Sequence, residues 1–261
     1  MIYTHNINPI LVSIGPIDLY WYGAMYAISF LLIDYMMKRE VNINQDFNFN
    51  IKIIDHLIMV SIISVIIGGR LGYVLFYNLE YYSLNPLKVF FIWEGGMSFH
   101  GALVGIYLGL VSVSMSYKIK LFKLSDFLVI FIPIGLFLGR IGNFINSELY
   151  GSPTHVNWGV IFPRVDLIPR HPSMLYESFL EGIILFLILL YVKNNKPNTG
   201  MLTSMFLIFY SLFRFSVEFV RVPDIQLGYL FSDWLTMGMI LCMPMFFIGI
   251  LIYYYSKKGR I

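Results

Sequence analysis

Charged residues are scarce in this chain. They make up 13% of its 261 residues, about half the share of roughly 25% that is usual in soluble domains. The formal net charge of +3 is too small to indicate nucleic-acid binding, so no nucleic-acid partner is predicted. A chain of this composition is not expected to be an ordinary soluble domain.

Cysteine is almost absent as well. Cys242 is the single cysteine, and it lies inside an apolar run. One cysteine cannot form an intrachain disulfide, and no Cys or His residues show metal-ligand spacing. We therefore expect neither a metal nor another cofactor. The first 20 residues also lack Lys, Arg and a small-residue cleavage site, so we expect no cleaved signal peptide.

Hydrophobic residues, in contrast, make up 58% of the chain and form many runs of nearly 20 residues. Such runs are long enough to cross a hydrocarbon core of about 30 Å as helices. They are continuous rather than alternating, which argues against strands and against an outer-membrane barrel. We predict an all-α polytopic membrane protein, with residues 1–261 forming a single membrane-embedded domain. The seven predicted helices are 20–37, 53–76, 97–116, 126–145, 173–192, 201–219 and 229–255, and the largest loop is 146–172.

Lys and Arg residues predict the orientation of these helices, because cytoplasmic loops retain them. Alternate loops hold eleven and four of the 18 Lys and Arg residues, and Arg70, Arg140 and Arg214 lie within spans. The side with eleven includes the C-terminal tail. The N-terminus is therefore predicted outside and the C-terminus in the cytoplasm.

This orientation brings polar residues of five helices to one depth, near the outer leaflet. The segments are YWYG (20–23), GGRLGY (68–73), GGMSFHG (95–101), GRIGNFIN (139–146) and RFSVEFVR (214–221). A charged side chain at a helix centre costs roughly 2.5–3.5 kcal/mol on insertion scales, so such residues face the bundle interior and usually mark function. Arginines that point into one pocket suit a phosphate, which the guanidinium binds through two oxygens.

Each feature also has a structural interpretation. Arg214, Glu218 and Arg221 lie on one helix face, and the first two can form an ion pair that only holds helices together. Tyr22 with Trp21 is typical of an aromatic belt, and a lone His100 is more often a packing residue. Glycines at four-residue spacing indicate close helix packing; they are Gly101, Gly105 and Gly109, and Gly135 and Gly139. Asp126 and Asp34 lie near predicted cytoplasmic helix ends, where capping or interfacial roles are the default. Glu177 and Glu181 share one face and suit the role of partners for the arginines.

The segment GRIGNFINSELYG (139–151) resembles the signature of the bacterial phosphatidylglycerol–prolipoprotein diacylglyceryl transferases. The matching positions are Gly139, Arg140, Gly142, Asn143, Phe144, Asn146, Glu148 and Gly151. Further similar blocks, in the family's order, are SIGPIDLYWYGAMY, GGRLGYVLFYN, GGMSFHGALVG, RHPSMLYE and FRFSVEFVRVPD. The SFHG block resembles the version in Gram-negative bacteria. Ala102 stands where a second glycine is common, and the loop after Gly151 is short.

The resemblance implies an activity and a location. These enzymes transfer the diacylglyceryl group of phosphatidylglycerol to the thiol of a lipobox cysteine in a prolipoprotein, and glycerol phosphate is released. The implied partners are phosphatidylglycerol, prolipoprotein signal peptides and membrane lipids. The implied location is the bacterial inner membrane, with the active site near the outer leaflet.

The chemistry of this reaction suggests roles for the site residues. A thiol with a pKa of about 8.5 is only slightly ionised at neutral pH, and His100 is the candidate base by residue type and depth. Arg140 and Arg214 are candidates to hold the departing phosphate. Tyr22 is a candidate to donate to the phosphate or to position the thiol. The remaining candidates, all for phosphatidylglycerol binding, are Asn143, Asn146, Glu148, Gly151 and Glu218.

A lipid or anion transporter, or a scramblase, is the alternative from another class. It would use the same outer-leaflet phosphate site. Transporters usually place their site near the midplane between repeated halves, whereas this sequence shows no repeat and its polar cluster lies near one face. A structural scaffold would leave the intramembrane arginines unexplained.

Overall fold

The structure is a computed structural model that describes residues 2–15, 17–44, 47, 49–92, 95–223, 228–230 and 234–261. In this part of the chain, five helices are long and apolar enough to cross a membrane, and a bent pair provides a sixth span if it is counted as one. The prediction of a helical, multi-pass membrane protein is confirmed. The count of seven spans and the direction of the termini stay predictions.

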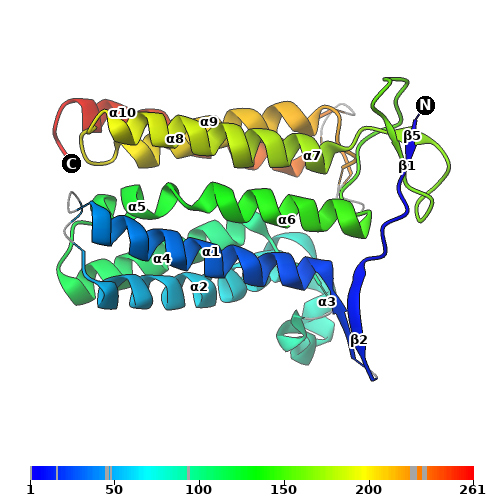
Figure 1. Cartoon of the computed structure of the whole chain (residues 1–261), viewed down its shortest axis with the longest axis horizontal. Coiled ribbons are helices and arrows are strands. Elements are labelled where there is room, and N and C mark those ends of the chain that lie inside the picture. The colour runs from blue at the N-terminus through cyan, green and yellow to red at the C-terminus, as the bar shows by residue number, and fades with distance from the viewer. Residues whose placement is uncertain are drawn as a thin grey trace. The chain divides into compact units, whose positions relative to one another are not determined.

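The chain forms two compact units, and the first contains the described residues 2–36, 126–223 and 229–261. Its helices pack as a bundle in which α9 contacts both α8 and α10, and α6 contacts η4. Figure 1 shows α8, α9 and α10 (yellow to red) side by side. Its helical elements are the first part of α1 (Trp21–Ile43), α6 (Ile132–Asn146), α7 (Ser173–Glu177), η4 (Ser178–Ile184), α8 (Leu185–Asn194), α9 (Met201–Glu218) and α10 (Met237–Lys257).

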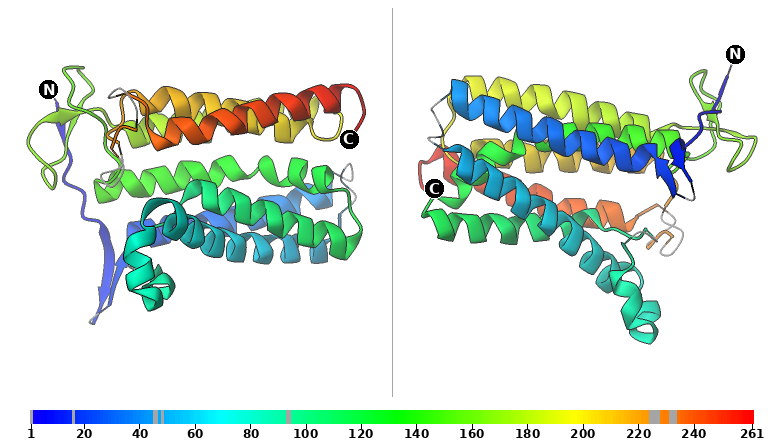
Figure 2. Two further views of the ribbon diagram at one scale, coloured as in Figure 1. Left: turned by 180° about the vertical axis from the view of Figure 1, so that it is seen from behind. Right: turned by 60° about the horizontal axis from the view of Figure 1, so that its bottom comes forward.

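The second unit contains the described residues 37–125 and 228. Its centre is the pair α2 (Ile51–Tyr77) and α4 (Phe99–Tyr117). The short helices α3 (Leu79–Leu84) and η2 (Pro86–Phe90) follow α2, and Figure 2 shows this segment (cyan to green) beyond the end of α2. The organisation of residues 1–261 as one domain remains a prediction.

Glycines account for the close contact of α2 and α4. A Cβ on Gly105 would lie 3.1 Å from the Cα of Gly68, and a Cβ on Gly72 would lie 3.1 Å from the backbone nitrogen of Gly101. Small residues let helix backbones approach closely in membranes. The expectation of close packing is confirmed for Gly101, Gly105 and Gly109. It is wrong for Gly135 and for Gly139, where an added Cβ would make ordinary contacts at 3.6 and 3.8 Å.

The boundaries of three predicted helices differ from the structure. The predicted helix 126–145 is broken into α5 (Leu121–Val129) and α6, which meet at a bend of 42°. Pro133 lies in the first turn of α6, where its missing N–H interrupts the helical hydrogen bonds. The predicted helix 229–255 begins only at Met237, because Thr236 caps α10, and its residues 231–233 lie outside the described residues. α1 extends to Ile43.

The argument against strands is wrong for the segments that flank the helices. The strands β2 (Ile10–Ile14) and β3 (Ile17–Tyr20) form an antiparallel hairpin directly before α1. The strands β1 (Tyr3–Thr4), β4 (Val160–Ile161) and β5 (Pro169–Arg170) form a small sheet in the order β1-β4-β5. The N-terminal segment therefore joins the 146–172 loop, a contact between distant segments that helix periodicity does not report.

Candidate functional site

The last turns of α9 carry the charged face that the sequence indicates. Arg214 Nη2 lies 2.9 Å from Glu218 Oε2, which confirms the expected ion pair. Arg221 Nη1 lies 3.9 Å from the same oxygen. The three residues are buried, with 5–8% of their surfaces exposed. The end of α9 and the turn that follows it therefore supply two guanidinium groups and one carboxylate to the interior of the first unit.

Glu177 of α7 connects this face to the signature on α6. Its Oε2 lies 2.8 Å from Arg140 Nε, and its Oε1 pairs with Arg214 Nη1. Arg221 Nη1 lies 3.9 Å from Oε1. The side chain of Glu177 is completely buried. Both candidate phosphate-binding arginines are thus held by one shared carboxylate, which fixes where their guanidinium groups lie.

Glu181 lies one turn beyond Glu177 and is equally buried. Arg140 Nη2 is 3.8 Å from Glu181 Oε2, a distance too long for a strong hydrogen bond. The two oxygens of Glu181 accept no hydrogen bond from the residues that the structure describes. Glu177 immediately precedes the π-helical segment η4, which contains Glu181, and such widened turns often occur at functional sites.

The start of α10 completes the cluster. Thr236 Oγ1 donates a hydrogen bond of 2.9 Å to Glu218 Oε1. Gly238 leaves room for the same carboxylate, since a Cβ there would lie 2.8 Å from Oε1. α6, the junction of α7 with η4, the end of α9 and the start of α10 therefore meet around three arginines and three glutamates. We call this group the arginine–glutamate cluster: Arg140, Glu177, Glu181, Arg214, Glu218 and Arg221.

The rest of the signature folds back on itself. Asn143 Nδ2 donates to Glu148 Oε2 at 3.4 Å, and Asn146 Nδ2 donates to Glu148 Oε1 at 3.3 Å. Ser147 ends α6 in a left-handed conformation with φ of 59°, which turns Glu148 toward both amides. The structure therefore brings the three predicted residues together, with Glu148 orienting the asparagines.

Tyr22 lies at the start of α1, beside the same stretch of α6. A Cβ on Gly142 would lie 3.0 Å from the Tyr22 ring, so this glycine lets α1 approach α6. The Tyr22 hydroxyl is 3.1 Å from the hydroxyl of Tyr26. A partly buried phenol is thus placed next to the signature.

Gly151 occupies a crossing of backbone segments. Its N–H donates to the carbonyl of His171 at 2.8 Å, and it forms a bridge with Arg221. A Cβ would lie 2.7 Å from the His171 carbonyl oxygen, so only glycine fits. Gly151 therefore ties the loop to Arg221, which lies just beyond the end of α9.

Arg170 fastens the same loop. Its Nε donates to Asp166 at 3.1 Å, its Nη1 donates to the Gly151 carbonyl at 3.2 Å, and its guanidinium lies over the Tyr150 ring. The hydrogen bonds from Arg170 lower the pKa of Asp166, and the same bonds raise the pKa of Arg170. Beneath them, Val160, Phe162 and Met174 form a small buried core. The loop is therefore folded, and its own ion pair and a small core hold it.

His100 belongs to the second unit. It is the second residue of α4, whose first turn is capped by Ser98, with Ser98 Oγ accepting from the Gly101 N–H at 3.1 Å. Gly101 in turn lies against α2. The candidate base therefore stands at a helix start that is fixed by both a cap and close helix packing.

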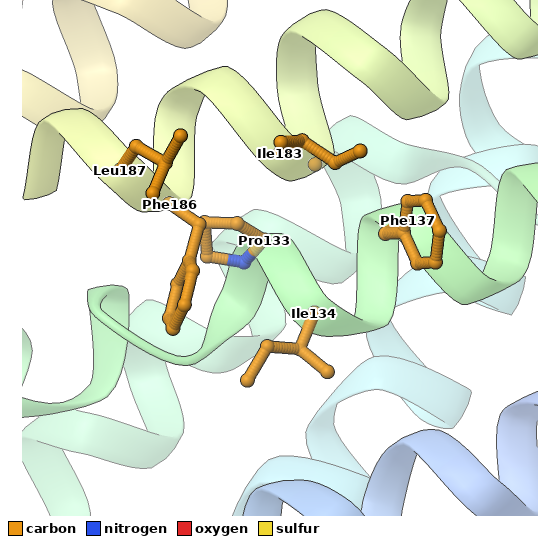
Figure 3. A pocket seen from close by; sticks show the side chains of 7 residues that line it. Pro133, Ile134, Phe137, Ile183, Phe186 and Leu187 are labelled. Atoms are coloured by element: carbon orange, nitrogen blue, oxygen red, sulfur yellow. The ribbon is translucent and has the colours of Figure 1, made fainter. Parts of the chain in front are cut away.

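One hollow of about 170 Å³ lies between α6 and the segment η4–α8. Figure 3 shows that its lining side chains are apolar: Pro133, Ile134, Phe137, Ile183, Phe186 and Leu187. A hollow without polar groups suits hydrocarbon and cannot hold a phosphate. Among the described residues, no group of three or more His, Cys, Asp or Glu side chains is arranged to hold a metal ion.

The predicted site omitted Glu177, Glu181, Arg221 and Thr236. The signal for Glu177 was present, because two carboxylates four residues apart in an apolar run need partners in the interior. Their role as partners of the arginines is confirmed for Glu177. Thr236 carried no such signal, since a threonine before an apolar run reads as a helix cap alone, which it also is.

Known proteins are similar to this chain in sequence over nearly its whole length. A family model described as prolipoprotein diacylglyceryl transferase matches residues 9–255. The chain belongs to the prolipoprotein diacylglyceryl transferase family. A phosphatidylglycerol–prolipoprotein diacylglyceryl transferase of Methylococcus capsulatus is 46% identical over 246 residues, which cover 94% of each chain.

Other bacterial proteins with the same name are similar to a comparable degree. The protein of Pseudomonas paraeruginosa is 47% identical over 250 residues, covering 94% of this chain and 92% of its own. That of Bordetella parapertussis is 43% identical over 254 residues, covering 97% of both. The family resemblance read from the signature is confirmed, and the chain is a transferase of this family.

Proposed function

We propose that this chain transfers the diacylglyceryl group of phosphatidylglycerol to the thiol of a lipobox cysteine in prolipoproteins. Membership of the diacylglyceryl transferase family supports the reaction. The observation that carries the site is the shared ion pairing of Arg140 and Arg214 with Glu177. Two guanidinium groups in a water-poor interior can stabilise a departing phosphate strongly.

The bond changes in this reaction define what the site must do. The sulfur attacks the carbon of the diacylglyceryl group that bears the phosphate and forms the carbon–sulfur bond. The carbon–oxygen bond breaks, and its electron pair leaves with the oxygen as glycerol phosphate. The thiol proton passes to a base. The products are a thioether, glycerol phosphate and the proton held by that base.

Arg140 is assigned to the departing phosphate. Its ion pairs use Nε and Nη2, which leaves Nη1 as the donor we assign to a phosphate oxygen. Its side chain is 15% exposed, against 9% for Arg214, so the arriving lipid reaches Arg140 more easily. Arg214, which pairs with the same Glu177, then adds positive charge next to Arg140.

The other residues have supporting assignments. Asn143 and Asn146, oriented by Glu148, donate hydrogen bonds to the headgroup, and Tyr22 donates to the phosphate or places the thiol. Gly151 lets the loop close over the lipid, and Glu218 orients Arg214. His100 accepts the thiol proton. The site lies near the outer leaflet of the bacterial inner membrane, where both the headgroup and the lipobox cysteine are accessible.

Isolated membranes incubated with phosphatidylglycerol and a lipobox peptide test this function. We expect a peptide that gains the mass of a diacylglyceryl group, together with glycerol phosphate in equal amount. A peptide with Ser in place of the lipobox Cys is the control and should stay unmodified. Movement of phosphatidylglycerol between leaflets without any product would favour the transporter alternative instead.

His100→Gln tests the base. Loss of a general base typically slows turnover 10²–10⁴-fold, while phosphatidylglycerol binding should stay nearly unchanged. A near-normal rate at neutral pH would make His100 a packing residue and place thiol activation elsewhere.

A further inference from the structure

Arg70 is the intramembrane arginine that the proposed reaction does not use. It lies in α2 and only 3% of its surface is exposed. A buried guanidinium needs partners for its five N–H donors. Among the described residues, its guanidinium donates to backbone carbonyls.

Five hydrogen bonds satisfy these five donors. Nε donates to the carbonyl of Val89 at 2.9 Å. Nη2 donates to Lys88 at 2.6 Å and to Phe91 at 3.1 Å. Nη1 donates to Gly95 and, at 3.2 Å, to Gly96. With every donor used in this way, Arg70 has none left for a lipid phosphate, so a phosphate-binding role does not explain it.

The partners of Arg70 lie in the segment that precedes α4. The carbonyls of Gly95 and Gly96 point to the guanidinium because both glycines have positive φ, of 82° and 79°. A Cβ on Gly96 would lie 2.6 Å from the Tyr73 ring. Two residues later, Ser98 donates its N–H to the Gly69 carbonyl at 2.8 Å and caps α4. The backbone between Arg70 and His100 is thus fixed at successive points to one stretch of α2.

We infer that Arg70 is a positioning residue for His100, acting through the carbonyls of Gly95 and Gly96 and the Ser98 cap. This inference rests on the proposed role of His100 as the base that accepts the thiol proton. A base must lie within hydrogen-bond distance of that proton, and displacement of a reacting group by about 1 Å can cost 10²-fold in rate. Arg70 supplies five bonds that resist such displacement.

Lys cannot replace this arrangement. Its ammonium is a single point with three donors, so it cannot donate to all five carbonyls that Arg70 binds. Arg70→Lys keeps the positive charge and therefore separates charge from geometry. Arg70→Gln removes both.

The test measures kcat and KM of purified Arg70→Lys and Arg70→Gln with phosphatidylglycerol and a lipobox peptide. We expect kcat to fall by about 10- to 100-fold for Arg70→Gln and less for Arg70→Lys, with KM for phosphatidylglycerol within about 2-fold of the original. Gly96→Ala disturbs the same contact without touching Arg70 and should also lower kcat. It serves as the second variant if Arg70→Gln does not fold.

A matched control separates positioning from general packing. Gly109→Ala would place a Cβ 2.7 Å from Val60 Cγ1 in the same pair of helices, away from the 95–98 loop. It should lower the melting temperature and leave the kcat of the folded protein unchanged. Equal loss of kcat in Gly109→Ala and Arg70→Gln at equal melting temperature would overturn the inference.

The double variant with His100→Gln decides whether Arg70 acts through the histidine. If it does, Arg70→Gln causes little further loss once His100 is gone, because coupled residues are non-additive. The inference is overturned if the kcat losses of the two single variants multiply in the double variant, or if Arg70→Gln has a normal kcat. Neither result affects the transferase function. Failure of the proposed base role is distinguishable, since His100→Gln alone would then retain full activity.

Discussion

At the scale of single residues, Glu177 and Glu181 form a natural comparison. Both are completely buried and four residues apart. Glu177 pairs with two arginines, whereas Glu181 is 3.8 Å from one. Identical chemical changes at these positions should therefore have different consequences.

We predict that Glu177→Gln destabilises the protein by about 3–5 kcal/mol, because it leaves two buried guanidinium groups without their shared carboxylate. Activity should fall with it, since Arg140 and Arg214 would repel each other. Thermal unfolding and the transfer assay on the same purified protein measure both effects.

Glu181→Gln is the matched control. It removes a buried carboxyl group that accepts no hydrogen bond from the described residues. The free energy of unfolding should therefore change by less than about 1 kcal/mol or increase. Equal destabilisation by the two substitutions would contradict the assignment of Glu177 as the centre of the cluster.

Arg140 should behave as a ligand-binding residue. Without it, Glu177 still pairs with Arg214, so the cluster keeps one of its main ion pairs. We predict that Arg140→Lys strongly impairs transfer, because Lys lacks the planar fork, and that Arg140→Ala impairs it more. Phosphatidylglycerol binding should fall in both, with only a small change in melting temperature.

Binding and unfolding measured on the same Arg140 variants decide between two roles. Normal phosphatidylglycerol binding with a large drop in melting temperature would mean that Arg140 is structural. Arg214 would then be the residue that holds the phosphate.

At the scale of helices, the contact of α2 with α4 leaves no room for larger side chains at its glycines. Gly105→Ala would force a Cβ to 3.1 Å from the Cα of Gly68, and overpacking of this kind typically costs 1–3 kcal/mol. Gly135→Ala on α6 meets only Ile33 Cδ1 at 3.6 Å. We predict that Gly105→Ala lowers the melting temperature clearly and that Gly135→Ala leaves it unchanged or raises it, since Ala favours helix.

Thermal unfolding in one detergent compares the two variants directly. Both add a single methyl group to a helical glycine, so hydrophobicity and helix propensity change alike. A tolerated Gly105→Ala would show that α2 and α4 separate easily and that the glycine row does not hold them.

At the scale of the whole molecule, orientation is the property to test. The split of eleven and four Lys and Arg residues predicts an external N-terminus and a cytoplasmic C-terminus. Reporter fusions should be active in the cytoplasm at the C-terminus and active outside within 146–172. A cytoplasmic 146–172 loop would place the signature on the wrong side for a lipobox cysteine and reject the site.

Much of this protein follows from its sequence. The apolar runs determine a helical multi-pass membrane protein, because their length matches the bilayer. The signature determines the family, and the Arg214–Glu218 pair follows from a four-residue spacing, since such residues are neighbours on any helix. Glycines every four residues predicted the surface of α4 that meets α2. These features are local, so the chain order alone reports them.

The tertiary structure decided which distant residues meet. Asp126 was expected to have a capping or an interfacial role. It caps α9, where it accepts from the N–H of Gly200, 74 residues away. Glu177 joins Arg140 to Arg214, and Arg70 binds carbonyls up to 26 residues further along the chain. The strand β1 forms where the N-terminal segment meets β4 of the 146–172 loop. Helix periodicity shows which face of a helix is polar, but the partner of that face depends on how the helices pack against one another.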